Sequence, residues 1–206
     1  MINIILKAKH WQLFLITFVI PMIFQLGFMG AFVSSIVTSD APDPSILLEY
    51  FSFFPIIILI TASVQFAWFW SVGVGLNKVI PDSLKLKISR FKIAFAIIII
   101  GMVGGMFIMW SLMNDIMVLS QQNFNPALPG ILLPLIFLSG FCTIYIYYFV
   151  AKTMRTAELQ REITVGDYIG EFFLIYFFPI GIWFLQPKIN IMIEDKSERN
   201  QLIDVL

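Results

Sequence analysis

Side chains that could carry out catalysis are few in this sequence, and they do not form a recognisable catalytic set. His10 is the only histidine and Cys142 the only cysteine, so neither a multi-histidine metal site, nor a Ser-His-Asp triad, nor an internal disulfide can be built. The sequence also lacks the G-x-S-x-G, H-E-x-x-H and P-loop motifs. We therefore predict that the protein is not an enzyme and has no catalytic residue, no cofactor and no metal site.

Glu158 and Glu162 form the acidic pair that comes closest to a catalytic motif. They lie in the segment AELQREI, which suggests an intramembrane protease of the glutamate type, yet no separate histidine motif follows. The four-residue spacing more simply describes the exposed face of a short helix, on which Glu158 and Arg161 can pair across one turn. We adopt this second interpretation.

Four polar side chains, those of Gln25, Gln65, Asp167 and Glu171, are candidates for functional or structural sites, because polar groups in hydrocarbon are costly. Gln25 and Gln65 are expected to hydrogen-bond across the first two apolar helices. Asp167 or Thr164 is expected to cap a later helix, and Glu171 lies where the dipole of that helix favours a carboxylate. We expect Glu171 to pair with a cytoplasmic basic residue; a ligand or gating role is the alternative.

The composition identifies the solvent in which these residues must be positioned. Of 206 residues, 59% are apolar and 13% charged, against roughly 25% charged in a soluble domain. A helix crosses the hydrocarbon core with about 20 apolar residues. Four stretches are long enough, namely residues 11–37, 46–75, 93–113 and 128–151. The first is too long for a signal peptide, so we predict an all-α polytopic membrane protein that forms a single transmembrane domain over residues 1–206.

The distribution of basic residues predicts the orientation of these helices. Lys and Arg gather near the N-terminus and between alternate apolar stretches, whereas residues 38–45 and 114–130 contain neither. The positive-inside rule then places the N-terminus in the cytoplasm. The basic loop before the third stretch adjoins two spans, so we expect it to contact membrane lipids rather than nucleic acid. The residues expected to touch lipid headgroups are Lys85, Lys87, Arg90 and Lys92.

Glycines and aromatic residues in the apolar stretches predict how the helices pack. Gly101 and Gly105 lie four residues apart on one helix face, where small residues let two backbones approach closely. Another helix of the same chain is the expected partner, and homodimerisation is the alternative. The aromatic runs FAWFW (residues 66–70) and YIYYF (residues 145–149) are expected at the membrane interface, where Trp and Tyr are enriched.

The segment 148–190 carries the most distinctive motifs. It contains an AK-x-(M/L)-x-x-x-E-x-Q-R run, followed by GEFF and FFPIGIW-x-x-QP-x-IN. These motifs, together with KHWQLFL and LKLKISRFK elsewhere, resemble a group of small uncharacterised bacterial multi-pass inner-membrane proteins. The resemblance implies a bacterial inner-membrane protein with an ordered structure after the fourth helix, and it implies no activity.

The fifth apolar segment, at about 169–186, is too short to cross the membrane comfortably. Sixteen residues separate Glu171 from Lys188, and as a straight helix they rise about 24 Å, short of a core of roughly 30 Å. Pro179 and Gly181 interrupt the run, which suggests a turn at Pro-Ile-Gly. We predict that Phe172 to Gln186 is re-entrant or interfacial, with the polar tail 187–206 cytoplasmic; a short fifth span with an external tail is the rival.

These observations define a class of function rather than a reaction. We expect a non-enzymatic accessory or structural component of the bacterial cytoplasmic membrane, and the alternative is a small transporter or channel with a path between the two helical hairpins. A membrane-protein partner or a homo-oligomer is possible in either case. An exposed apolar groove would favour the first class, whereas a continuous polar cavity reaching the middle of the bilayer would favour the second.

Overall fold

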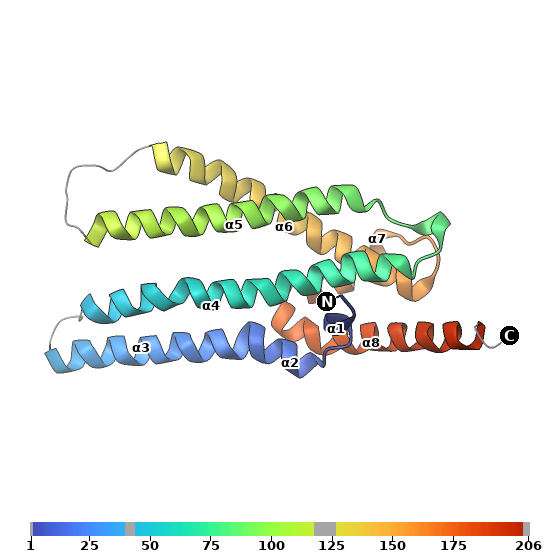
Figure 1. The fold of residues 1–206 in the computed structure, drawn as a ribbon, viewed down its shortest axis with the longest axis horizontal. Coiled ribbons are helices and arrows are strands. Elements are labelled where there is room, and N and C mark those ends of the chain that lie inside the picture. The colour runs from blue at the N-terminus through green and yellow to red at the C-terminus, as the bar shows by residue number, and fades with distance from the viewer. Residues whose placement is uncertain (1, 40–43, 118–126, 204–206) are drawn as a thin grey trace. The chain divides into compact units, whose positions relative to one another are not determined.

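A computed structural model describes residues 2–39, 44–117 and 127–203 of the chain (Figure 1). The described residues form helices joined by short turns, with no strand among them, which confirms the predicted all-α class. The chain divides into two compact units: the first comprises Met1–Lys85 and Ala151–Leu206, and the second Leu86–Val150.

Four of the described helical stretches are long and apolar enough to cross a membrane, as the sequence predicted. They are His10–Thr38, Ser52–Lys78, Ile88–Ile108 and Pro134–Leu159. The fourth continues beyond the predicted end at residue 151, through Lys152 and Arg155. Charged residues limit how far a segment extends into the hydrocarbon core. They do not end a helix, because Lys and Arg are good helix formers.

The first unit begins with a short helix and a long hairpin. Helix α1 (Ile2–Leu6) precedes α2 (His10–Phe14), the π-helical turn η1 (Leu15–Val19) and α3 (Ile20–Ser39). Pro21 lies two residues after the end of this wide turn. Because a proline ring has no N–H and crowds the preceding turn, it is a sufficient local cause for the π-helical geometry.

The second half of this hairpin runs into tighter turns at its end. Helix α4 (Pro44–Trp70) packs against α3 and continues into the π-helical turn η2 (Ser71–Gly75) and the 3-10 turn η3 (Leu76–Lys78). A further 3-10 turn, η4 (Asp82–Leu84), precedes the second unit. The buried core at this end includes Trp68 and Phe69, which are 0% and 2% exposed. Because α8 covers these two side chains, they do not face lipid headgroups as expected, and the level of the aromatic run in the membrane stays a prediction.

The second unit contains α5 (Ile88–Met117) and the part of α6 (Ala127–Leu159) that ends at residue 150. A Cβ atom at Gly101 would collide with the hydroxyl of Ser139 on α6. At Gly104 it would contact Leu135, at 3.6 Å, whereas at Gly105 it would have no described atom within 4 Å. The close approach therefore occurs within the chain, at Gly101 and, less tightly, at Gly104; Gly105 has no such contact among the described residues, and its packing role stays a prediction.

The last two helices form a tight hairpin in the first unit. Helix α7 (Val165–Tyr176) ends at Phe177, and α8 (Phe178–Ile203) turns back and packs alongside it (Figure 1). The break precedes the expected Pro-Ile-Gly turn, because Pro179 lies in the first turn of α8, where no N–H is required. Gly181 is needed instead for packing, since a Cβ atom there would overlap the carbonyl oxygen of Leu174.

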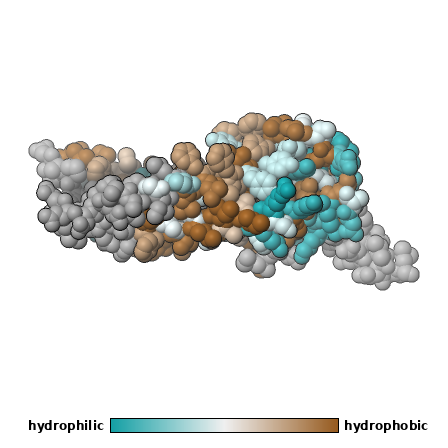
Figure 2. Space-filling model, turned by 90° about the horizontal axis from the view of Figure 1, so that it is seen from above, coloured by the Kyte–Doolittle hydropathy of each residue, from teal (hydrophilic) through white to brown (hydrophobic). Residues whose placement is uncertain are grey.

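The surface separates polar from apolar residues. In the view of Figure 2, hydrophilic residues gather in one region, while hydrophobic residues cover much of the rest of the coloured surface. Large apolar side chains on the long helices are exposed, for example Ile23 and Leu26 on α3 and Ile100 on α5. Exposed apolar faces on helices of this length are expected when the surrounding solvent is lipid.

Candidate functional site

The polar residues of the first unit concentrate where α6, α7 and α8 meet, and this α6–α7–α8 junction begins with a helix cap. Helix α6 ends at Leu159, and Gln160 adopts a positive φ of 50°. Thr164 then precedes α7, and its backbone N–H and hydroxyl donate to Oδ2 of Asp167 at 2.8 and 3.0 Å. The structure thus places Thr164 and Asp167 together as a capping pair.

The Asp167 carboxylate is further stabilised by a neighbouring cation. Arg161 Nη2 donates to its Oδ1 at 3.0 Å. The hydrogen bonds from Thr164, first of all the backbone one, and then Arg161, lower the pKa of Asp167 below the usual 3.8. Arg161 therefore pairs with Asp167, not with Glu158 as the spacing suggested. Glu162 lies beyond the end of α6, so the two glutamates do not share a helix face.

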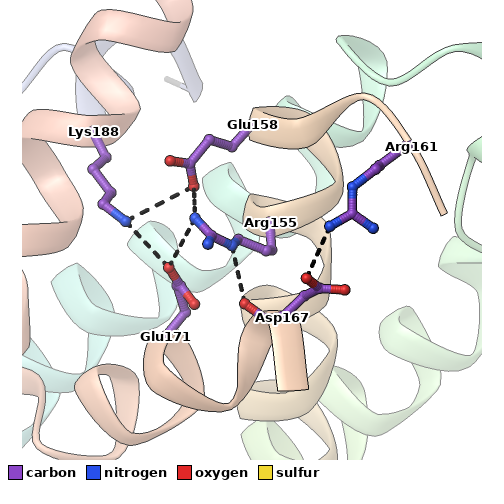
Figure 3. A network of polar contacts seen from close by, with 6 residues as sticks. All are labelled: Arg155, Glu158, Arg161, Asp167, Glu171 and Lys188. Carbon is purple, nitrogen blue, oxygen red and sulfur yellow. Dashed lines mark hydrogen bonds and ion pairs between the residues drawn. The ribbon is translucent and has the colours of Figure 1, made fainter. Parts of the chain in front are cut away.

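Four charged residues form a closed ring between the three helices (Figure 3). Arg155 Nη1 on α6 donates to Glu158 Oε2 at 2.7 Å, and Lys188 Nζ on α8 donates to Glu171 Oε1 on α7 at 3.2 Å. Arg155 also lies 3.6 Å from Glu171, and Lys188 lies 3.8 Å from Glu158. Two cations alternate with two anions, so the ring has no net formal charge.

The ring accounts for the burial of Glu171. Its side chain is 9% exposed, whereas those of Arg155 and Lys188 are 26% and 40% exposed. A carboxylate at this depth is strongly destabilising unless it is paired and hydrogen-bonded. Glu171 thus forms the expected ion pair with basic residues. It lies in the second turn of α7, where Asp167 rather than Glu171 caps the helix.

A second polar cluster is centred on Gln186, which is fully buried in α8. Its Oε1 accepts a hydrogen bond of 2.7 Å from the indole N–H of Trp68 on α4. Its amide protons are shared among four acceptors: Leu6 O and Ala8 O at 3.0 Å, Asn190 Oδ1 at 3.1 Å and Ile5 O at 3.3 Å. Gln186 therefore satisfies carbonyl groups at the end of α1 that helix geometry leaves without partners.

Sequence reasoning missed Gln186, Arg155 and Lys188 as site residues. Gln186 did carry a signal, since it is an amide in the apolar run IWFLQP, like the glutamines that were singled out. Its partners could not be inferred from spacing, because Trp68 lies 118 residues earlier in the chain. Arg155 and Lys188 carried no such signal, because basic residues beside a span equally indicate topology.

A groove between the two helices of the first hairpin contains the two predicted glutamines. It encloses about 570 Å³, and its polar lining residues are Thr17, Gln25, Thr61 and Gln65, set among apolar side chains. Gln25 accepts a hydrogen bond of 2.7 Å from the Tyr50 hydroxyl of α4, so it does bond across the two helices. The side-chain amide of Gln65, which is half-buried, forms no hydrogen bond to any residue that the structure describes.

The basic residues before the third span are all exposed, as headgroup contact would require. Lys85 forms an ion pair with Asp82, and Lys87, Arg90 and Lys92 lie on the surface. Within the described ranges, no group of three or more His, Cys, Asp or Glu side chains is placed to hold a metal ion.

Comparisons with protein-family models, with curated proteins and with solved structures gave no match to this chain. Its function is therefore inferred from its own residues and contacts. The charged ring and the Gln186 cluster satisfy most of their own polar groups, which suits a structural role. The groove of the first hairpin, called here the α3–α4 groove, has a mostly apolar lining. It also contains the amide of Gln65, which makes no hydrogen bond to a described residue.

Proposed function

We propose that the protein is a non-enzymatic accessory protein of the bacterial cytoplasmic membrane, which binds a transmembrane helix of another membrane protein in the α3–α4 groove. The single observation that supports this function is the position of Gln65. Its half-buried amide faces the groove and makes no hydrogen bond to a described residue. The partner helix would supply a side chain that hydrogen-bonds to this amide.

The unpaired amide of Gln65 is significant because of its depth in the membrane. Gln65 lies 13 residues before Lys78, the charged residue at the end of the second span (78 − 65), which corresponds to a rise of about 20 Å from that end. This places it inside a hydrocarbon core of roughly 30 Å, away from water and headgroups. An amide in hydrocarbon costs free energy unless it is hydrogen-bonded, and lipid tails offer no such bond.

A transmembrane helix is the occupant that satisfies both parts of the groove. Its apolar residues would pack against the apolar lining, and one polar residue would reach Gln65. Thr61 lies one turn away on the same helix and extends the polar strip. Hydrogen bonds between membrane helices contribute about 0.6 kcal/mol on average. Gln65 would therefore determine the position at which the partner helix docks more than it would increase the binding affinity.

The transporter alternative receives less support from the same groove. Its lining contains no ionisable side chain, and the charged residues of the junction are paired with one another. Ion and proton pathways usually need ionisable groups inside the membrane. The same proposal places the N-terminus in the cytoplasm and the protein among the bacterial group that the C-terminal motifs resemble. It also assigns contact with anionic headgroups to Lys85, Lys87, Arg90 and Lys92.

Site-specific photocross-linking in native membranes tests the proposal. A photoreactive amino acid at Ile58 faces the groove, and one at Leu59, which is exposed on α4 but does not line the groove, is the matched control. We expect an adduct with another membrane protein from position 58 only. The cross-linked peptide should lie in a transmembrane segment that carries a polar residue, and a cross-linker placed there should recover this chain.

Removing the amide provides the second half of the test. Gln65→Leu should lower the yield of the adduct about threefold, which is the effect of 0.6 kcal/mol. Adducts with lipid alone, with a second copy of the chain, or equally from positions 58 and 59 would overturn the proposal. An adduct whose yield does not depend on Gln65 would do the same.

A further inference from the structure

The α7–α8 hairpin has an apolar face that the first unit does not cover. On α7, Ile169 and Phe173 are 42% and 54% exposed, and they lie four residues apart on one side of the helix. The exposed side chains continue through the turn and along α8 with Phe177, Ile180 and Phe184, which are 55%, 64% and 58% exposed. The face thus runs from one helix to the other.

The opposite face of the hairpin is also apolar, but it is buried. Ile175, Ile182 and Leu185 are fully buried. The charged residues lie toward the other end of the hairpin, where Glu171 meets Lys188. The part of the hairpin nearest the turn is therefore apolar on both faces, which is the pattern of a segment that lies in lipid rather than on its surface.

Two distances along the helices measure how deep the turn lies. The ring of Phe178 is 5.1 Å from that of Trp68, and Trp68 lies ten residues before Lys78, the last residue of the second span (78 − 68). Along α8, ten residues also separate Phe178 from Lys188 in the charged ring (188 − 178). Each count corresponds to a rise of about 15 Å, or half of a core of roughly 30 Å.

Contacts with the first span place the α8 side of the hairpin beside the first turns of that span. The rings of Trp183 and His10 are 4.6 Å apart, and those of Trp183 and Phe14 are 5.5 Å apart. His10 and Phe14 belong to the first turns of the span His10–Thr38. Trp183 is itself 44% exposed, so the exposed face of the hairpin is continuous with the surface of a membrane span.

The backbone of the turn is also suited to hydrocarbon. The N–H of Phe177 donates to Phe173 O at 2.9 Å, and those of Ile180 and Gly181 donate to Phe177 O at 3.0 and 2.8 Å. Irregular backbone is tolerated at membrane depth only where its polar groups are satisfied and protein surrounds it. Three N–H groups of the turn are thus paired within it, and Trp68 and Phe69 cover one side of it through their contacts with Phe178.

We propose that the α7–α8 hairpin is a re-entrant element whose exposed face, from Ile169 to Phe184, binds the acyl chains of the cytoplasmic leaflet. It enters to about half the thickness of the hydrocarbon core, turns at Phe177 and returns to the side from which it came. The N-terminus and the end of α8 then lie on the same side of the membrane. The inference does not depend on the α3–α4 groove.

Spin labels in reconstituted protein test this depth. The full chain, with Cys142→Ala and one new cysteine, is placed in vesicles of phosphatidylethanolamine and phosphatidylglycerol. Labels replace Phe177 or Ile180 near the turn, and Glu194 on the exposed part of α8 is the control. We expect the labels at 177 and 180 to collide several-fold more with oxygen than with a water-soluble nickel complex, and the label at 194 to show the reverse.

Two further measurements test the depth and the orientation of the hairpin. A label at Phe173, farther from the turn, should show an intermediate depth, and it serves if Phe177→Cys does not fold. Cysteines at Lys9 and Glu194 should react with an impermeant maleimide from the same side of the vesicle. Access of the nickel complex to 177 and 180 in the vesicles would show that the face lies in water, and it would overturn the proposal. Reaction of 9 and 194 from opposite sides would show that the segment crosses.

Discussion

Gln186 and Gln65 are the same kind of side chain in two different surroundings of the first unit. Gln186 is fully buried in the junction, where it accepts a hydrogen bond from Trp68 and donates to backbone carbonyls and to Asn190. Gln65 is half-buried beside an apolar groove, and its amide has no hydrogen-bond partner in the described part of the chain. One amide is used completely within the chain, whereas the other remains available.

This contrast separates structural from binding roles among polar residues in a membrane protein. A polar group placed in hydrocarbon for stability should be fully paired within the chain, because the unpaired state is costly. A polar group kept for a partner should be paired only after binding. The junction and the α3–α4 groove are therefore expected to respond in opposite ways when their polar groups are removed.

The largest predicted effect is that of Gln186→Leu. The substitution leaves the buried indole N–H of Trp68 and the carbonyls of Leu6 and Ala8 without their partner. Because each buried unsatisfied group costs about 1–3 kcal/mol, we expect a loss of about 3–4 kcal/mol. Equilibrium unfolding in mixed detergent micelles measures it.

The matched substitution Gln65→Leu should be neutral or stabilising by up to about 1 kcal/mol in the isolated protein, because it removes an unpaired amide. The stability changes predicted for Gln186→Leu and Gln65→Leu thus differ in direction. If both variants lose the same stability, Gln65 is paired in the folded protein and the proposed difference between the two regions is wrong.

A second prediction concerns the tight turn of the junction. Gly181→Ala forces a methyl group onto the carbonyl oxygen of Leu174, and overpacking against backbone should destabilise the protein by about 2–3 kcal/mol. Gly170→Ala is the control, since a Cβ atom there has no described atom within 4 Å. Alanine at 170 should stabilise α7 by up to about 1 kcal/mol. Thermal unfolding in detergent distinguishes them, and equal behaviour would argue against the close approach.

The sequence predicted the fold well because the membrane imposes strong constraints on composition. Long apolar stretches had to be helices, and all four spans were predicted from length and hydropathy. The helix start at Thr164 was also predictable, because the capping pattern is local. What failed were details of packing: Trp68 is buried rather than exposed to lipid headgroups, since α8 covers it and no pattern within α4 indicates that contact.

The candidate sites were less predictable because their contacts join distant parts of the chain. The charged ring joins Arg155 and Glu158 on α6 to Glu171 on α7 and Lys188 on α8. Spacing on one helix paired Glu158 with Arg161, but the loop after Leu159 takes Arg161 to Asp167 instead. Gly104 was missed for a related reason: helix periodicity gives candidate faces, but only the partner helix selects which of them is in contact.

A third prediction tests whether the charged ring stabilises the junction. Glu171→Gln removes the anion that faces both Arg155 and Lys188. Because these cations are partly exposed, we expect a loss of about 1–2 kcal/mol rather than the larger cost of a fully buried pair. A double-mutant cycle with Lys188→Gln should give a coupling of about 1 kcal/mol. Glu49→Gln, an exposed glutamate near the first hairpin's turn, should change stability by less than about 0.5 kcal/mol.

The smallest predicted effect is the pH response of the cap at Asp167. The hydrogen bonds from Thr164 and the nearby Arg161 lower the pKa of Asp167 below 3.8. A carboxyl group whose pKa is lower in the folded state stabilises the fold above its unfolded pKa, and it loses that contribution as the pH falls through the folded pKa. The cap should therefore contribute fully at neutral pH and fade only below about pH 4.

Asp167→Asn isolates this contribution, because asparagine retains a side-chain oxygen but cannot ionise. The melting temperature of the wild type should exceed that of Asp167→Asn at pH 7, and the difference should shrink as the pH is lowered below about 4. Measuring the difference between the two proteins cancels the titration of other carboxyl groups. A difference that is constant across this range would show that the charge of Asp167 does not stabilise α7. A difference that instead disappears near pH 6 would point to another titrating group at the cap.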